Sequence, residues 1–299
     1  MYESHFGLRE APFGITPDTS FFFKSPHSQE ALNTLLVAAR SGEGFIKITG
    51  EVGTGKTLLC RTFMKTLGED FVTAYLPNPL LEPRTLMLAL ADELELPLAS
   101  DVDQHQLLKS LTARLLELAG QGKRVVLCID EAQTIPRESL EALRLLTNLE
   151  TEKRKLLQIV LFGQPELNEH LQAQSIRQLA QRITFQHDLG GLTRDDMEYY
   201  LAHRLRVAGF TGARLFSKGA VSKLFAASRG IPRLVNIIAH KAMLAAYGEG
   251  RQRIDAHHVK LAARDTAVAR QRGWPWLATG LALAALAAAG ALLSYRLTL

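Results

Sequence analysis

A glycine-rich run near residue 50 has the residue types and spacing of a phosphate-binding loop. Residues 50–57 fit the pattern G-x-x-x-x-G-K-[ST]. Glycines let the backbone fold around a phosphate with its N–H groups pointing inward, a lysine can reach phosphate oxygens, and a threonine hydroxyl can bind Mg²⁺. We therefore expect ATP and Mg²⁺ to bind here, through Gly50, Glu51, Val52, Gly53, Thr54, Gly55, Lys56 and Thr57.

The acidic pair Asp130-Glu131 is the second candidate for chemistry. It follows the apolar run 124–129, and side chains at the carboxyl end of a buried strand lie where open α/β sheets bind ligands. There Asp130 can hold Mg²⁺, and Glu131 can orient and polarise an attacking water. An acidic pair after a strand is also a common helix N-cap. Its position downstream of the phosphate loop favours the catalytic interpretation.

The surrounding pattern predicts the elements that position these residues. We expect strands at 45–49, 71–76, 124–129, 156–162 and 182–189, alternating with helices at 27–40, 56–67, 84–94, 104–120, 137–148 and 165–180. This alternation predicts an α/β fold with a doubly wound parallel sheet. After a hinge at Gly190-Gly191 only helices are expected, at 194–208, 217–229, 232–247 and 255–271, the first opened by a capping box at Thr193.

One segment near the C-terminal end is exceptional in composition. The chain of 299 residues is 47% apolar and 22% charged, which is typical of a globular protein, and Cys60 and Cys128 are expected to be buried thiols. Residues 274–293 contain no charge, and twenty helical residues span about 30 Å. Tryptophans and a tyrosine stand at the two ends of this run. The pattern favours one transmembrane helix over an alanine-rich core helix.

The charge distribution predicts orientation and bears on partners. Between residues 251 and 272, six Lys or Arg side chains face two aspartates, which accounts for most of the formal net charge of +5. Arginines are more frequent before the span than after it, which places the N-terminal bulk in the cytoplasm. The rest of the chain is nearly neutral, so we expect no nucleic-acid partner. The expected units are 1–190 (nucleotide-binding), 191–272 (lid and basic juxtamembrane segment) and 273–299 (transmembrane helix and short tail).

Together these motifs resemble those of AAA+ ATPases. The stretches MYESHFGLREAPFGITPD, GFIKITGEVGTGKT, CIDEAQ, LRLLTNLET and LFGQPEL are similar to the secretion-ATPase family, which includes the A component of type II secretion and an ATPase of MSHA-pilus biogenesis. The A component continues past its span into a peptidoglycan-binding domain. This sequence ends six residues beyond residue 293, which favours the MSHA-type architecture. The resemblance implies a single-pass ATPase of the bacterial inner membrane that acts on components of a type IV pilus or type II secretion machine.

The resemblance also implies roles for residues outside the two motifs. Gln164, after the fourth expected strand, matches sensor 1, and Arg233 of the sequence GIPR matches sensor 2. Arg182 matches an arginine finger that acts on the nucleotide of a neighbouring subunit, with Arg177 as the alternative, and the implied assembly is a hexameric ring. Pro17-Asp18 matches the adenine pocket. Each could instead be an ordinary turn, helix-end or surface residue.

Two other functions share these core motifs. One is a DNA-associated AAA+ ATPase of transposition or origin recognition, and the other is a nucleotide-switched scaffold with little turnover. The nearly neutral charge of the expected soluble part weighs against the first. The intact acidic pair at residues 130–131 weighs against the second.

Overall fold

Five parallel strands form the centre of the α/β unit. The structure, a computed structural model, describes residues 1–98, 102–150, 155–173 and 176–266. The strands are β1 (Phe45–Thr49), β2 (Phe71–Leu76), β3 (Arg124–Ile129), β4 (Leu157–Gly163) and β5 (Ile183–Asp188), and their order is β2-β3-β4-β1-β5. The expected sheet class is confirmed. Two connections pass over other strands of the sheet: the one from β1 to β2 passes β4 and β3, and the one from β4 to β5 passes β1.

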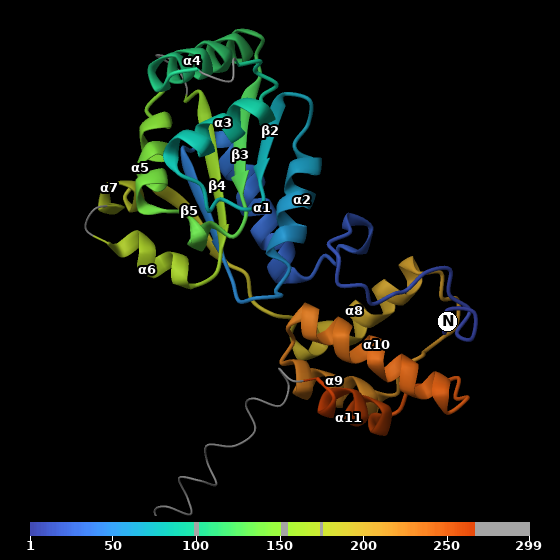
Figure 1. The fold of residues 1–299 in the computed structure, drawn as a ribbon. Helices are drawn as coiled ribbons and strands as arrows, with labels where there is room; N and C mark the ends of the chain where they lie inside the picture. Colours follow the sequence, from blue (N-terminus) through green and yellow to red (C-terminus); the bar gives the residue numbers. More distant parts are fainter. Residues whose placement is uncertain (99–101, 151–154, 174–175, 267–299) are drawn as a thin grey trace, which may run out of the picture.

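Helices cover both faces of this sheet (Figure 1). Successive side chains of a strand point to opposite faces, so on β3 Val126 and Cys128 pack in a different cluster from Leu127 and Ile129. The first cluster contains α1 (Pro26–Ser41) and α2 (Lys56–Thr66). The second contains the apolar sides of α3 (Pro83–Glu93), α4 (Gln104–Gly120), α5 (Arg137–Leu146), α6 (Glu166–Gln172) and α7 (Arg177–Ala180). Both cysteines are free and buried, as expected.

The expected single helix over 165–180 is wrong. The helix α6 ends at Gln172, and its C-cap Ala173 has an extended backbone (φ −58°, ψ 136°), which stops the helical hydrogen-bond ladder. A second short helix, α7, begins at Arg177. Leu167, Leu171 and Leu179 are all buried in one core. Their spacing therefore fits one helix, although the helical conformation stops at Ala173.

The lid consists of four helices, α8 (Arg194–Val207), α9 (Lys218–Ser228), α10 (Pro232–Gly248) and α11 (Ala256–Arg264). Thr193 and Asp196 form the expected capping box of α8. The helix expected to run to residue 271 ends at Arg264. Asp265 is its C-cap, and the ammonium group of Lys241 binds both the carboxylate and the carbonyl oxygen of Asp265. A cation is favourable at a helix C-terminus because it pairs with unsatisfied carbonyls.

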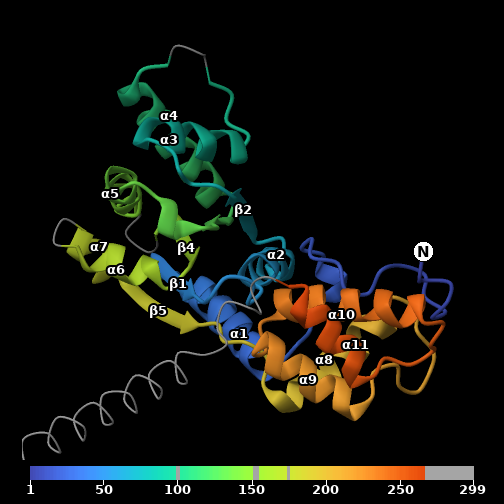
Figure 2. The same ribbon diagram turned by 60° about the horizontal axis from the view of Figure 1, so that its bottom comes forward.

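Most of the N-terminal segment packs with the lid (Figure 2). Its buried side chains, which belong to the same cluster as the lid helices, are Tyr2, Phe6, Leu8, Phe13 and Phe21. These five side chains, which belong to the expected unit 1–190, complete the lid core, because they and the apolar sides of the lid helices are buried together.

Across the described residues, no helix combines the length and apolar character needed to cross a bilayer. The expected span at 274–293 lies outside the described residues.

Candidate nucleotide-binding site

The glycine-rich loop connects β1 to α2 and leaves the start of that helix available to an anion. Gly53 and Gly55 adopt φ of +84° and +104°, a region that favours glycine. Gly55 is the N-cap of α2, and no side chain caps this helix. Backbone N–H groups at the first turn of a helix have no partner within the helix and carry partial positive charge. The loop therefore presents donors of the kind that bind phosphate.

Lys56 is buried, with its ammonium group turned onto the loop itself. The Nζ atom donates to the carbonyl oxygens of Gly50 at 2.7 Å and Glu51 at 3.1 Å. Burial lowers the pKa of Lys56, and the carboxylates of Glu131 and Asp130 oppose this shift. The ammonium group is thus held at the loop by neutral acceptors, which the charged oxygens of a phosphate can replace.

Thr57 and Asp130 bring two oxygen ligands together. The Thr57 hydroxyl donates to Asp130 Oδ2 at 2.5 Å, and the N–H of Glu131 donates to Oδ1 at 3.0 Å. Burial raises the pKa of Asp130, against the effect of these hydrogen bonds. Within the described chain, no Lys, Arg or His forms an ion pair with this carboxylate. A buried carboxylate beside a hydroxyl fits Mg²⁺, which prefers oxygen ligands and would neutralise phosphate charge there.

Glu131 has an unusual backbone for a residue with a side chain. Its φ and ψ are 50° and 37°, the left-handed conformation, which costs on the order of 1–3 kcal/mol when the surroundings impose it. The N–H and O–H groups of Thr134 both donate to the Glu131 carbonyl at 2.9 Å and hold this turn. Strain of this kind concentrates at functional sites. The turn directs the carboxylate toward the strand end that carries Gln164.

The sheet order explains how distant residues meet. Neighbouring strands β3, β4 and β1 end in Asp130-Glu131, Gln164 and the glycine-rich loop, respectively. The Gln164 side chain donates to Glu131 Oε2 at 3.2 Å. The sequence pattern missed Gln133, whose Nε2 donates to the same Oε2 at 2.6 Å. Its place two residues after Glu131 in the run DEAQ was the available signal.

The lid closes the other side of this pocket, a cavity of about 180 Å³. Arg233 is the second residue of α10, and its backbone N–H donates to the carbonyl of Gly53 in the loop at 3.1 Å. A Cβ atom added at Gly53 would lie 2.6 Å from the Cβ of Arg233, so a larger residue does not fit there. Pro17 and Asp18 line the same cavity, as does Glu131. Four candidates expected from sequence thus share one pocket with the phosphate loop.

A buried polar network, not expected from sequence, attaches the N-terminal segment to the lid side of the pocket. Arg204 donates to the carbonyls of Pro12 at 2.6 Å and Gly14 at 3.2 Å, and its guanidinium lies over the Phe21 ring. Tyr200 donates to Asn236 at 2.8 Å. The three residues that share these contacts come from α8 and α10, and all line the cavity: Tyr200, Arg204 and Asn236. No short motif marks them, because the N-terminal carbonyls that Arg204 and Asn236 bind lie 190 to 222 residues away in the chain.

Arg182, the first arginine-finger candidate, does not line this pocket. Arg182 precedes β5, and its Nη1 donates to Asn148 Oδ1 at 2.5 Å and to Thr147 Oγ1 at 3.3 Å. These contacts tie it to the end of α5 within its own chain. Arg177 begins α7, but its side chain lies outside the described atoms.

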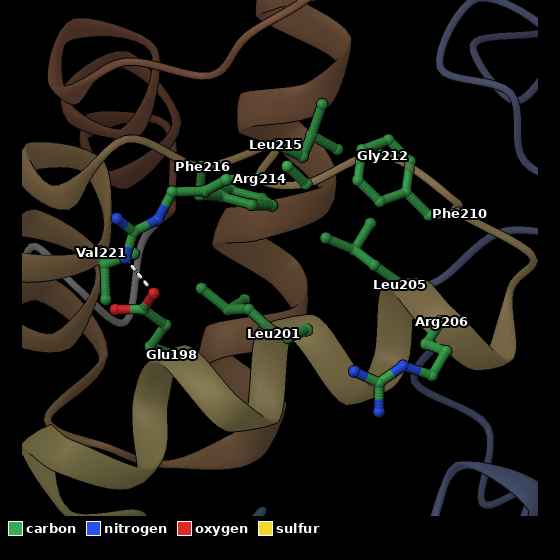
Figure 3. A pocket seen from close by; sticks show the side chains of 12 residues that line it. Glu198, Leu201, Leu205, Arg206, Phe210, Gly212, Arg214, Leu215, Phe216 and Val221 are labelled. Carbon is green, nitrogen blue, oxygen red and sulfur yellow. Dashed lines mark hydrogen bonds and ion pairs between the residues drawn. The ribbon is translucent and has the colours of Figure 1, made fainter.

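Two further features of the lid do not resemble a phosphate-binding or metal-binding site. A hollow of about 120 Å³ lies between α8, α9 and the loop 209–216, with apolar walls and an ion pair between Glu198 and Arg214 (Figure 3). On α11, His257 and His258 lie beside Glu249. The N–H of Asp255 donates to His258 Nδ1, so Nε2 carries the proton and donates to Glu249. This hydrogen-bonded arrangement leaves Nε2 of His258 without a lone pair for a metal ion.

Comparisons with known proteins agree with this geometry. Residues 39–171 match the family model described as an AAA domain. Two solved structures share the fold: the ORC2 protein of Aeropyrum pernix in ADPNP-ADP complexes (TM-score 0.61, 17% identity, 84% of this chain and 72% of that one) and CDC6P of Pyrobaculum aerophilum (TM-score 0.65, 18% identity, 83% and 70%). The match to the AAA domain, together with a glycine-rich loop and an acidic pair at the same edge of the sheet, places the chain among the AAA+ ATPases.

A curated relative narrows the group. The chain is 42% identical over 273 residues to General secretion pathway protein A of Aeromonas hydrophila, covering 91% of this chain and 50% of the relative. The chain therefore belongs to the AAA+ secretion-ATPase family, as its motifs predicted. It spans about half the length of that relative.

Proposed function

We propose that this protein is an ATPase of a bacterial type II secretion or type IV (MSHA-type) pilus machine. The observation that carries the proposal is the convergence of five side chains on one edge of the sheet: Lys56, Thr57, Asp130, Glu131 and Gln164. Of these, Lys56, Thr57 and Glu131 line the cavity that the lid closes. The 42% identity to General secretion pathway protein A supports the association with secretion. The protein would bind MgATP and use hydrolysis to remodel membrane components of the machine.

The geometry supports a catalytic role for each of these residues. Lys56 and the N–H groups at the start of α2 bind the phosphates, and Thr57 and Asp130 hold Mg²⁺. Glu131 accepts the proton of the attacking water, with Gln164 beside it, and Arg233 brings positive charge from the lid. The left-handed turn at Glu131 and its hydrogen bonds to glutamine side chains support its role as the base.

We further propose that the active site is completed in a ring, with six subunits as the expected number. Arg182 lies outside its own pocket, so it would have to act on the nucleotide of a neighbour, with Arg177 as the alternative. An arginine supplied in this way stabilises charge that develops in the transition state. The dependence of specific ATPase activity on protein concentration measures this assembly.

We also propose that the uncharged run 274–293 anchors the protein in the inner membrane with the ATPase in the cytoplasm. The support comes from the sequence: the length of the run, its terminal aromatic residues and the arginines before it.

One experiment tests activity and anchor together. Membranes from bacteria that express the full chain are washed with carbonate, dissolved in detergent, and the purified protein is assayed for phosphate release. We expect the protein to stay in the membrane through the wash and to hydrolyse ATP. The Glu131→Gln variant should bind ATP but keep only a small residual turnover, because an amide cannot accept the proton. Release of the protein by carbonate would contradict the proposed membrane anchor. Equal turnover in the variant and the wild type would show that Glu131 is not the catalytic base.

A further inference from the structure

The carboxylate of Glu131 is held asymmetrically. Its Oε2 atom accepts a hydrogen bond from Gln133 Nε2 at 2.6 Å and another from Gln164 Nε2 at 3.2 Å. Among the described residues, no donor contacts Oε1. One oxygen is therefore fixed by two amides, and the other is open to a water molecule.

The orientation of the Gln133 side chain is determined by its other partner. The backbone N–H of Gln164 donates to Gln133 Oε1 at 3.0 Å. A backbone N–H can only donate, so the amide oxygen of Gln133 must face it and the NH₂ group must face Glu131. Gln133 thus connects the end of β4 to the carboxylate that follows β3.

The charged neighbours do not replace this support. Lys56 donates to the loop carbonyls of Gly50 and Glu51. Asp130 accepts from Thr57 and from the N–H of Glu131. Both are occupied, so the position of the Glu131 carboxylate depends on the two glutamine amides.

We propose that Gln133 is a positioning residue that holds Glu131 Oε2 so that Oε1 accepts the proton of the attacking water. This inference rests on the proposed ATPase activity. In that step the water oxygen forms a bond to the γ-phosphorus, the bond to the bridging oxygen breaks with its electron pair on ADP, and a water proton passes to Oε1. A general base contributes roughly 10²–10⁴-fold when it is correctly placed, and Gln133 secures that placement through Gln164 and Glu131.

The test compares three variants of the full chain. Gln133→Met keeps the length of the side chain without its hydrogen bonds, and Gln133→Glu keeps the acceptor for the Gln164 N–H but turns a second carboxylate toward Glu131. Gln104→Ala, exposed at the start of α4, is the control. We expect kcat to fall about tenfold to a hundredfold in Gln133→Met and further in Gln133→Glu. KM and the affinity for N-methylanthraniloyl-ATP should stay as in the control, because the interaction acts in the transition state.

A double variant separates positioning from a structural role. In the Glu131→Gln background, Gln133→Met should reduce the residual turnover no further, since Gln133 acts through the Glu131 carboxylate. Unchanged kcat in Gln133→Met, or an equal further loss in the double variant, overturns the inference while the proposed ATPase stands. A wild-type chain without turnover overturns the proposed function itself, and the inference with it.

Discussion

The two sides of the nucleotide pocket are built from the chain in different ways. The P-loop side (residues 50–57, 130–133 and 164) follows three neighbouring strands of one sheet. The lid side (residues 14–21, 200, 204, 233 and 236) joins the N-terminal segment to two lid helices. The P-loop side carries the groups that can bind phosphate and move a proton. The lid side carries buried hydrogen bonds that hold the remaining walls in place.

The two sides therefore contribute differently to the site: one supplies the chemical groups, and the other encloses the nucleotide. Chemistry at the P-loop side depends on short stretches that a strand fixes directly. Two hydrogen bonds join the lid side to the P-loop side: the N–H of Arg233 donates to the carbonyl of Gly53 at 3.1 Å, and Arg61 on α2 donates to the carbonyl of Pro17 at 3.0 Å. We infer that substitutions on the P-loop side abolish catalytic steps, whereas substitutions on the lid side change how the pocket closes.

The largest expected effect is the loss of ATP turnover in two single variants, one on the P-loop side and one at the arginine-finger candidate, and its recovery when the two are mixed. Lys56→Ala should lose ATP binding, because it removes the buried charge that meets the phosphates. Arg182→Ala should bind ATP and lose about 10³–10⁵-fold in rate if it acts as an arginine finger. A mixture of the two variants should regain turnover, since one supplies intact loops and the other intact arginines. Phosphate release from titrated mixtures measures this.

The control for that mixture is Arg40→Ala, an exposed arginine on α1. On its own, Arg40→Ala should hydrolyse ATP at the wild-type rate. Mixed with Lys56→Ala, it should behave as the wild-type protein does in the same mixture. Activity that stays flat with protein concentration, together with no regain in the mixture, would rule out action between subunits. Regain with Arg177→Ala in place of Arg182→Ala would move the assignment five residues upstream.

The difference between the two sides also explains which parts of the site could be predicted from the sequence. The loop at 50–57 and the pair Asp130-Glu131 are local motifs, so their chemistry was readable, and alternating strands and helices predicted the parallel sheet. Arg204 was not selected, because its partners Pro12 and Gly14 are far away in the chain. Packing of the N-terminal aromatic residues against the lid is also a long-range contact. Apolar periodicity reports that a side chain is buried and gives no information on its partner.

A smaller effect is expected where the two sides touch. Gly53→Ala places a Cβ atom 2.6 Å from the Cβ of Arg233, and the alanine must also adopt a φ of +84°. The lid would have to shift by about 1 Å, a displacement that can cost about a hundredfold in rate. Gly42→Ala is the matched control, because its φ is +82° and its added Cβ meets nothing within 4 Å. Both should lose about 1 kcal/mol of stability from the left-handed backbone.

Only Gly53→Ala should also lose turnover, and this separates backbone strain from lid contact. Steady-state kinetics and thermal unfolding of both variants provide the measurement. An equal loss of turnover in the two would show that strain alone is responsible. An unchanged kcat in Gly53→Ala at reduced stability would show that contact between the loop and the lid is dispensable for hydrolysis.

The smallest expected effect is a gain in stability on the P-loop side. Burial raises the pKa of Asp130 above its value in the unfolded chain, so the protonated form favours folding. That contribution is complete below the unfolded pKa and is lost as pH rises through the folded pKa. At neutral pH the ionised carboxylate therefore destabilises the nucleotide-free fold. In Asp130→Asn, the amide oxygen can accept from the Glu131 N–H and the NH₂ group can donate to the Thr57 hydroxyl, so both of these groups keep a partner, and only the long 3.5 Å hydrogen bond from the Tyr75 hydroxyl is lost.

We expect Asp130→Asn to raise the Tm of the nucleotide-free protein by about 2–4 °C at neutral pH, the shift for about 1 kcal/mol in a chain of this size class, with the gain shrinking as pH falls. Addition of MgATP should reverse the order, because a ligand stabilises the form that binds it and the variant lacks the Mg²⁺ carboxylate. Asp70→Asn, at an exposed turn, should change neither value. Thermal unfolding across a pH series, with and without MgATP, is the measurement. A variant that melts below the wild type without nucleotide, or that gains as much from MgATP, would show that Asp130 is neither strained by burial nor a ligand of the metal.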